Sequence, residues 1–299
     1  MNIHGTMTQS ITHKTLYAYF DIDRLNVAWE VAVGRIKSAP PNTPTNFGVS
    51  IWSYNICKKL ANDKCNKSIF DEFALERERL IHYPNKVSRL QGVYFFKNKE
   101  DAIEAIHRWN IPKKNLNYIS SVRFAATNMT EVDSEWITDC LGTGTQEQWM
   151  DKYWAGETRW ENPLTEILAL GVGHVENTQL REQAYKNILK IAPYSSPLLY
   201  AACCAFHCGM TDVALTIPAL TSDKSYIHGN YYIQADKLDE KALISSINYC
   251  RQQGYSMPIK KHPDDSIIFT LPDLRNESFK IHSSKLLSTF TEIKTLHSL

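Results

Sequence analysis

Two short segments place side chains with useful chemistry next to predicted strands. Ser88 and Arg89 precede the aromatic run 92–96, in which Tyr94 is central, and Glu166 opens a second apolar run. An arginine fork can bind a pyrophosphate through two charge-assisted hydrogen bonds. An aromatic face attracts a flat cationic ring, and a carboxylate can stabilise positive charge that develops on a sugar. These side chains are therefore the first candidates for ligand binding and catalysis in the sequence.

The elements that must position these side chains alternate between strands and helices up to about residue 178. Apolar or alternating runs predict strands, and capping residues followed by apolar stripes predict helices. The predicted strands cover 16–20, 92–96, 118–124, 132–137 and 166–172, with a turn at 128–130 and a break at Gly171. The predicted helices begin at Ser68, at the cap Asn98 and at Thr145.

After residue 178 the pattern becomes mainly helical. Helices are predicted over Leu180–Ile191, Pro197–Cys208 and Asp239–Gln253, and from Ser283 to the C-terminus. Because chains of this length usually form one large or two ordinary domains, we predict a mixed lobe over 14–178 and a mainly helical lobe over 179–299. The fold class expected is α+β.

Composition excludes several classes of protein. The 299 residues carry a formal net charge of +1 and are 43% hydrophobic, so neither global disorder nor a polyanion-attracting field is expected. No apolar run is long enough to span a bilayer, and the seven cysteines lack the spacing of a disulfide framework. We expect a soluble protein, cytoplasmic or delivered into a host cytoplasm by a dedicated secretion system, without membrane contact.

Cys203, Cys204, His207 and Cys208 superficially suggest metal ligands. On one helix they would point in two directions, and no second cluster completes a four-coordinate site. We therefore expect no metal here and interpret the cysteines as small buried side chains. The sequence also lacks GxGxxG and GxxxxGK[ST], so neither a Rossmann nor a P-loop nucleotide site is predicted.

The run Gly92-Val93-Tyr94-Phe95, which follows Ser88-Arg89 and precedes a helix, resembles the second core strand of the ADP-ribosyltransferase superfamily. Its poly-ADP-ribose polymerase branch carries Gly-(Val/Ile)-Tyr-Phe there. Thr165-Glu166-Ile167-Leu168 is similar to the strand that bears the family's catalytic glutamate, and 153–157 (YWAGE) resembles a motif of an uncharacterised bacterial branch.

This resemblance implies a split, mixed β-sheet lobe that binds NAD as a substrate. It implies that Tyr94 stacks on the nicotinamide and that Glu166 is catalytic. Glu135, in the acidic turn 131–135, is the alternative catalytic carboxylate that the sequence offers. Ser88, Arg89 and Tyr17 are the other expected NAD-binding residues. The family's first strand normally presents His or Arg, which this one lacks, so that motif stays open among the arginines Arg24, Arg35 and Arg89.

The function implied is mono-ADP-ribosylation, a glycosyltransferase reaction, by a bacterial toxin or secreted effector. Because the charge is balanced, we expect a protein acceptor, and a host metabolic enzyme such as glutamate dehydrogenase is one candidate. Two alternatives remain open. One is a nucleic-acid ADP-ribosyltransferase of toxin–antitoxin type, and the other is a catalytically silent module that uses the NAD fold, or the C-terminal lobe, only for binding.

Overall fold

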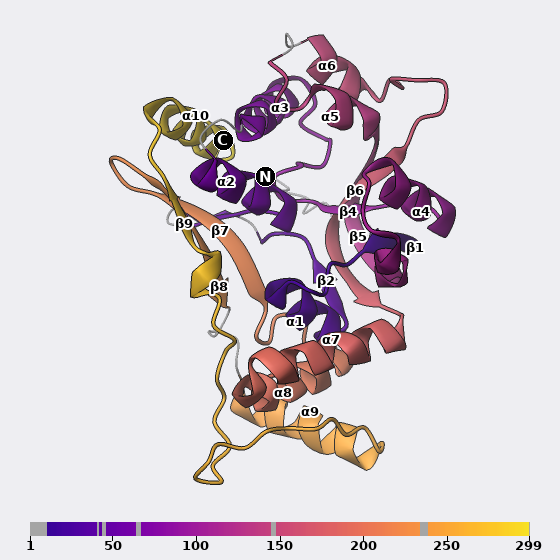
Figure 1. The fold of residues 1–299 in the computed structure, drawn as a ribbon, viewed down its shortest axis with the longest axis vertical. Coiled ribbons are helices and arrows are strands. Elements are labelled where there is room, and N and C mark those ends of the chain that lie inside the picture. The colour runs from indigo at the N-terminus through magenta and orange to yellow at the C-terminus, as the bar shows by residue number, and fades with distance from the viewer. Residues whose placement is uncertain are drawn as a thin grey trace, which may run out of the picture.

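Two antiparallel sheets and their covering helices make up the computed structural model, which describes residues 11–40, 42–43, 46–63, 67–144, 148–233 and 239–298 (Figure 1). The α+β class is confirmed. Every described strand pair is antiparallel, where the sequence predicts a mixed sheet.

The first sheet has the order β1-β5-β6-β2, and β4 also pairs with β6. The long strand β6 is therefore flanked on one side by β5. On its other side two short strands, β4 and β2, pair with different parts of β6, so the sheet is split there. Backbone bonds between Tyr17 and Phe96 join β1 to the end of β4 and close β1, β5, β6 and β4 into a ring. The bounds are β1 Thr12–Tyr19, β2 Arg35–Lys37, β4 Val93–Phe95, β5 Ile119–Asp133 and β6 Thr165–Val175.

The second sheet has the order β3-β7-β8-β9 and draws three of its strands from the second half of the chain. The segment 179–299 is thus less helical than predicted. The β7–β8 hairpin was not predicted. Its turn is stabilised by the Asp223 carboxylate, which accepts hydrogen bonds from the N–H groups of Ser225 and Tyr226, both at 2.7 Å. The bounds are β3 Phe47–Gly48, β7 Thr216–Ser222, β8 Ile227–Ile233 and β9 Phe279–Ile281.

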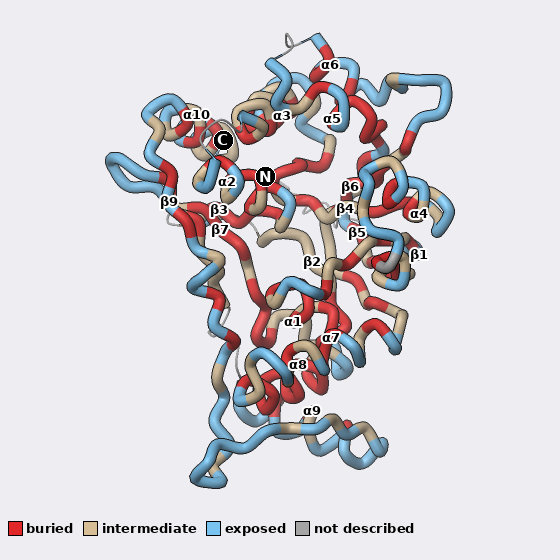
Figure 2. The backbone as a smooth tube through the Cα atoms, viewed as in Figure 1, coloured by how far each residue is buried: buried red, intermediate tan, exposed pale blue. Residues whose placement is uncertain are grey.

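Eight of the ten described helices pack in three cores, while α4 packs in a smaller core with β5 and α9 packs on α8. One face of the first sheet packs on α1, α7 and α8, the second sheet packs on α2, α3 and α10, and a third core joins α3, α5 and α6 (Figure 2). The bounds are α1 Leu25–Val33, α2 Ile51–Asn62, α3 Ser68–His82, α4 Lys99–Arg108, α5 Glu135–Cys140, α6 Gln148–Ala155, α7 Thr178–Ile191, α8 Ser196–His207, α9 Glu240–Gln252 and α10 Ser284–Leu296. Each helix in the described part of the chain is too short or too polar to cross a bilayer.

The first core crosses residue 178, where the sequence predicts the boundary between the lobes. It contains Trp29 of α1 together with Leu199 of α8, and the Trp29 indole donates a hydrogen bond to the carbonyl of Ala214 at 3.0 Å. The packing of α1 against α7 and α8 therefore ties the two predicted segments together.

Most predicted helices are confirmed, and the strand over 132–137 is wrong. The segment 128–130 is a paired part of β5 instead of a turn. The β-bulge lies just before it, between Ala126 and Asn128, and β5 ends at Asp133. The Asp133 carboxylate accepts the N–H of Glu135 at 3.1 Å at the start of α5. The predicted start of a helix at Thr145 lies outside the described residues.

Gly171 does not break its strand. Its φ is +142°, and an added Cβ would lie 2.1 Å from the carbonyl oxygen of Ala125 in β5, so only glycine fits here. With glycine at this position, β6 continues to Val175.

Candidate functional site

Tyr17, Tyr94 and Glu166 lie on three neighbouring strands in the order β1, β4, β6. Tyr94 lies opposite Leu168 and Phe95 opposite Ile167, so the next residue in the same register, Phe96, falls opposite Glu166. Phe96 is also bridged to Tyr17. Opposite residues of an antiparallel pair project to the same face, as do residues two apart. The three predicted site residues therefore project from one face of the ring.

Helices α3 and α6 cover part of this face. Tyr94 and Leu168 pack there against Leu75 of α3 and against Tyr153 and Trp154 of α6. The Trp154 indole donates to the carbonyl of Leu75 at 2.9 Å, which fixes α6 on α3. Both aromatic residues of the 153–157 run are therefore buried in this core.

Arg89 is the centre of a buried polar cluster on this face. Its side chain is 2% exposed and that of Glu72 is 0% exposed. The guanidinium donates to both Glu72 oxygens, with Nη2–Oε1 and Nε–Oε2 distances of 3.1 Å. Nη1 donates to the Tyr153 hydroxyl at 2.8 Å and to Glu166 Oε2 at 3.2 Å. One arginine thus joins two carboxylates and a tyrosine.

Two aromatic rings flank the guanidinium. The Arg89 Cζ atom lies 5.1 Å from the centroid of the Tyr94 ring and 5.5 Å from that of Tyr153. The Tyr94 hydroxyl also donates to the backbone carbonyl of Arg89 at 2.6 Å. Tyr94 therefore contacts the arginine through its ring and its hydroxyl, and cation–π attraction adds to the ion pairs.

Burial dominates the electrostatics of this cluster. Desolvation raises the pKa of Glu166, and the Arg89 guanidinium only partly offsets this. Burial also disfavours the charged form of Arg89, but Glu72 and the neighbouring Tyr153, Tyr94 and Glu166 together outweigh burial and raise the arginine's pKa well above its usual value. Glu166 is thus a carboxyl group whose proton is held more tightly than usual, beside a permanent cation.

Ser88 belongs to a neighbouring cluster. Its hydroxyl donates to Glu76 Oε2 at 2.7 Å, and Glu76 pairs with Arg79 at 2.7 Å and with His297 at 2.8 Å. Burial acts to raise the pKa of Glu76, but the bonds from His297 and Arg79 prevail and lower it. His297 follows α10, so this cluster holds the C-terminal helix against α3.

The remaining predicted residues have other partners. Glu135 of α5 pairs with Arg108 of α4 at 2.9 Å. Of the three arginines considered for the first-strand motif, the two besides Arg89 are engaged as well: Arg24 pairs with Asp21 at 3.1 Å and Arg35 with Glu30 at 2.6 Å. Arg89 faces Glu72 and Glu166, where the sequence analysis expects a pyrophosphate.

The sequence analysis missed Glu72 and the polar contact of Tyr153. A signal for Glu72 is nevertheless present in its spacing. It lies three and four positions from Ile69 and Glu76 and next to Phe73, and all four are buried on one face of α3. A carboxylate on an apolar stripe indicates a buried partner.

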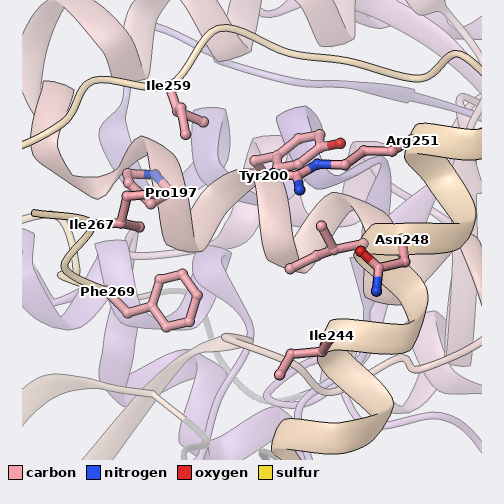
Figure 3. A pocket seen from close by; sticks show the side chains of 9 residues that line it. Pro197, Tyr200, Ile244, Asn248, Arg251, Ile259, Ile267 and Phe269 are labelled. Carbon is pink, nitrogen blue, oxygen red and sulfur yellow. The ribbon is translucent and has the colours of Figure 1, made fainter.

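A separate pocket lies in the second half of the chain, between α8, α9 and the segment that follows α9 (Figure 3). Its volume is about 230 Å³, and apolar side chains such as Ile244 and Phe269 line it together with Arg251 and Asn248. Figure 1 places α8 and α9 at the opposite end of the molecule from α3 and α6.

Cys203 and Cys204 are buried, as the sequence analysis expects, while Cys208 is exposed. Across the described ranges, no group of three or more His, Cys, Asp or Glu residues is arranged to hold a metal ion.

The model of one protein family, described as DUF2441, a protein of unknown function, matches residues 7–180. No curated protein matches the chain. The matched segment contains β1, β4 and β6 and with them Tyr17, Tyr94, Arg89 and Glu166. Because the match covers more than half of the 299 residues, the chain belongs to the DUF2441 family.

Proposed function

We propose that this protein is an ADP-ribosyltransferase that cleaves NAD and transfers ADP-ribose to a protein acceptor, as a bacterial toxin or secreted effector would. The observation that carries the proposal is the shared face of Tyr17, Tyr94 and Glu166 on three adjoining strands, with Arg89 bonded to Glu166. The order of the two strand motifs along the chain, around Tyr94 and Glu166, and their resemblance to two of the family's strands support it further.

In the proposed reaction the bond between nicotinamide and the ribose C1 breaks, nicotinamide leaves with the bonding electrons, and an acceptor nucleophile bonds to C1 and loses a proton. Glu166 stabilises the positive charge that develops on the ribose, and the Tyr94 ring attracts the cationic nicotinamide. Glu166 is 6% exposed, so the proposal requires the side chains around it to move apart when NAD binds.

The test is incubation of the purified chain with NAD labelled in its adenylate part, together with either cell lysate or total nucleic acid. Label on a discrete protein is the expected result. Label on nucleic acid would instead indicate the toxin–antitoxin type, and free ADP-ribose alone would indicate an NAD hydrolase. Glu166→Gln is the matched control, since it keeps the shape of the side chain and cannot carry the charge.

A catalytically silent binding module is the second candidate. The contacts of Arg89 favour it, because Nε, Nη1 and Nη2 all donate to protein acceptors and the side chain is 2% exposed. Calorimetric titration with NAD separates the two candidates: binding without turnover would support the silent module, and turnover would exclude it.

A further inference from the structure

The Glu72 carboxylate is bonded more extensively to Arg89 than Glu166 is. Glu72 accepts hydrogen bonds from both Nε and Nη2 of Arg89. Glu166 accepts one only from Nη1, at 3.2 Å, and Nη1 also donates to the Tyr153 hydroxyl at 2.8 Å. A planar guanidinium has a fixed fork, so a bidentate partner on one edge determines where the remaining N–H groups point. The two hydrogen bonds to Glu72 thus determine how the Arg89 guanidinium is oriented toward Glu166.

Glu72 is itself held in place. Its Oε1 atom accepts a hydrogen bond from the Trp52 indole at 2.9 Å, and its side chain is completely buried on α3. Trp52 is 40% exposed and its ring lies 6.2 Å from that of Tyr94. The carboxylate therefore connects a residue at the protein surface with the buried guanidinium.

We propose that Glu72 is a positioning residue for Glu166: by binding the Nε–Nη2 edge of Arg89, it limits the guanidinium to a single, shared hydrogen bond with the Glu166 carboxylate. Its importance for catalysis rests on the proposed function. Its effect on the charge state of Glu166 does not, because that effect follows from the contacts alone.

The physical consequence is that two buried carboxylates compete for one cation. The groups that face Glu166 are Arg89, with which it pairs, and Glu72, Tyr153 and Tyr94 around that arginine. Glu72 acts on Glu166 in two ways with the same sign, because its negative charge repels a second carboxylate and its bonds occupy the guanidinium. Burial is the largest cause of the raised pKa of Glu166, and the charge of Glu72 acts in the same direction.

The experiment measures the titration of Glu166 in protein labelled with ¹³C at the glutamate carboxyl carbon, without NAD. The Glu166 signal is the one absent from Glu166→Gln. In Glu72→Gln the repelling charge is gone and Arg89 is free to turn, so the titration midpoint of Glu166 is expected to fall. An unchanged or higher midpoint in a folded Glu72→Gln protein would overturn the proposal.

Two further variants keep the test decisive. Trp52→Phe removes the other hydrogen bond to Glu72 without touching Arg89, and its midpoint is expected to match that of the wild type. If Glu72→Gln does not fold, Glu72→Asp keeps the charge but withdraws the carboxylate by one methylene from the guanidinium, and the midpoint is again expected to fall. An unchanged midpoint in Glu72→Asp would then be the contrary result.

Failure of the proposed function would look different. If the protein neither binds nor cleaves NAD, the titrations still decide whether Glu72 controls Glu166. If it does cleave NAD, the acidic limb of the rate profile should move to lower pH in Glu72→Gln, in parallel with the carboxyl titration. A limb that stays in place while the midpoint falls would overturn the catalytic part of the inference.

Discussion

The Arg89 cluster and the pocket between α8 and α9 differ in which kind of side chain is buried and which is exposed. In the cluster, charged groups are buried and bond to one another; in the pocket, apolar groups are left open to solvent, with Ile244 50% and Phe269 54% exposed. Buried polar networks are strongly coupled, so removing one member leaves the others unpaired. Exposed apolar side chains contribute little to folding, and a contiguous patch of them more often serves binding.

The largest effect on stability is expected from Arg89→Ala. The substitution leaves Glu72 and Glu166 buried without their cation, and breaking such a pair typically costs about 3–5 kcal/mol. Chemical denaturation at neutral pH measures the loss. Arg123→Ala is the matched control, because Arg123 pairs with Glu176 but its side chain is 69% exposed, so its loss should stay below about 1 kcal/mol. Equal losses in the two variants would show that the cluster is not a coupled unit.

Glu166→Gln should lower the rate of ADP-ribose transfer by about 10²-fold or more, equivalent to roughly 2.7 kcal/mol of barrier, because the amide cannot stabilise the developing charge. NAD affinity should change much less. Transfer rate and NAD dissociation constant are measured on the same preparation. Near-normal transfer would remove Glu166 from the chemistry and direct attention to Glu135→Gln.

The same variant has a pH-dependent effect on stability. A carboxyl group with a raised pKa in the folded state favours folding in its protonated form, and that contribution is lost as pH rises through the folded pKa. The amide of the Glu166→Gln variant cannot ionise, so this loss does not occur there. The stability of Glu166→Gln relative to the wild type should therefore increase from acidic to neutral pH, as followed by melting temperature across pH. A constant difference would contradict the direction assigned to the Glu166 pKa.

Phe269→Ser, in the pocket, is expected to have the smallest effect. The ring is 54% exposed, so its removal should change the free energy of unfolding by no more than about 0.5 kcal/mol. Urea denaturation measures this. A loss of several kcal/mol would mean that the segment after α9 is an integral part of the core.

Local sequence patterns predicted most of the described helices, because each signal lies within a few residues, but they missed α1, α2 and α5. The Asn98 side chain accepts the N–H of Asp101 at 2.7 Å, and Ser283 caps α10 in the same way at 3.3 Å. The residues of α7 and α8 were similarly predicted from their apolar spacing. Strand pairing was harder, because β3 and β7 come from distant parts of the chain.

The candidate site was only partly accessible to the sequence analysis. Tyr94, Arg89 and Glu166 were singled out, and the fold brings them together. The partner of Arg89 could not be read from local spacing, since Glu72 lies on another element and approaches through the packing of α3 on the sheet. Neighbouring positions in the sequence do not ensure a shared site. Ser88 precedes Arg89, yet its hydroxyl donates a hydrogen bond to Glu76 in a different cluster.

The closed ring of strands has a consequence for synthesis of the chain. Leu16 in β1 pairs with Val122 in β5, and β4 pairs mainly with β6. Each of these two early strands therefore pairs with a strand that is synthesised later. Such long-range pairings form slowly, because a large loop must close before any contact compensates for it. On the ribosome the ring cannot be completed until Val175 has emerged. Nascent chains that stop before β6 should therefore expose β4 and β5 as unpaired edges and depend on chaperones, while complete chains pair both with β6.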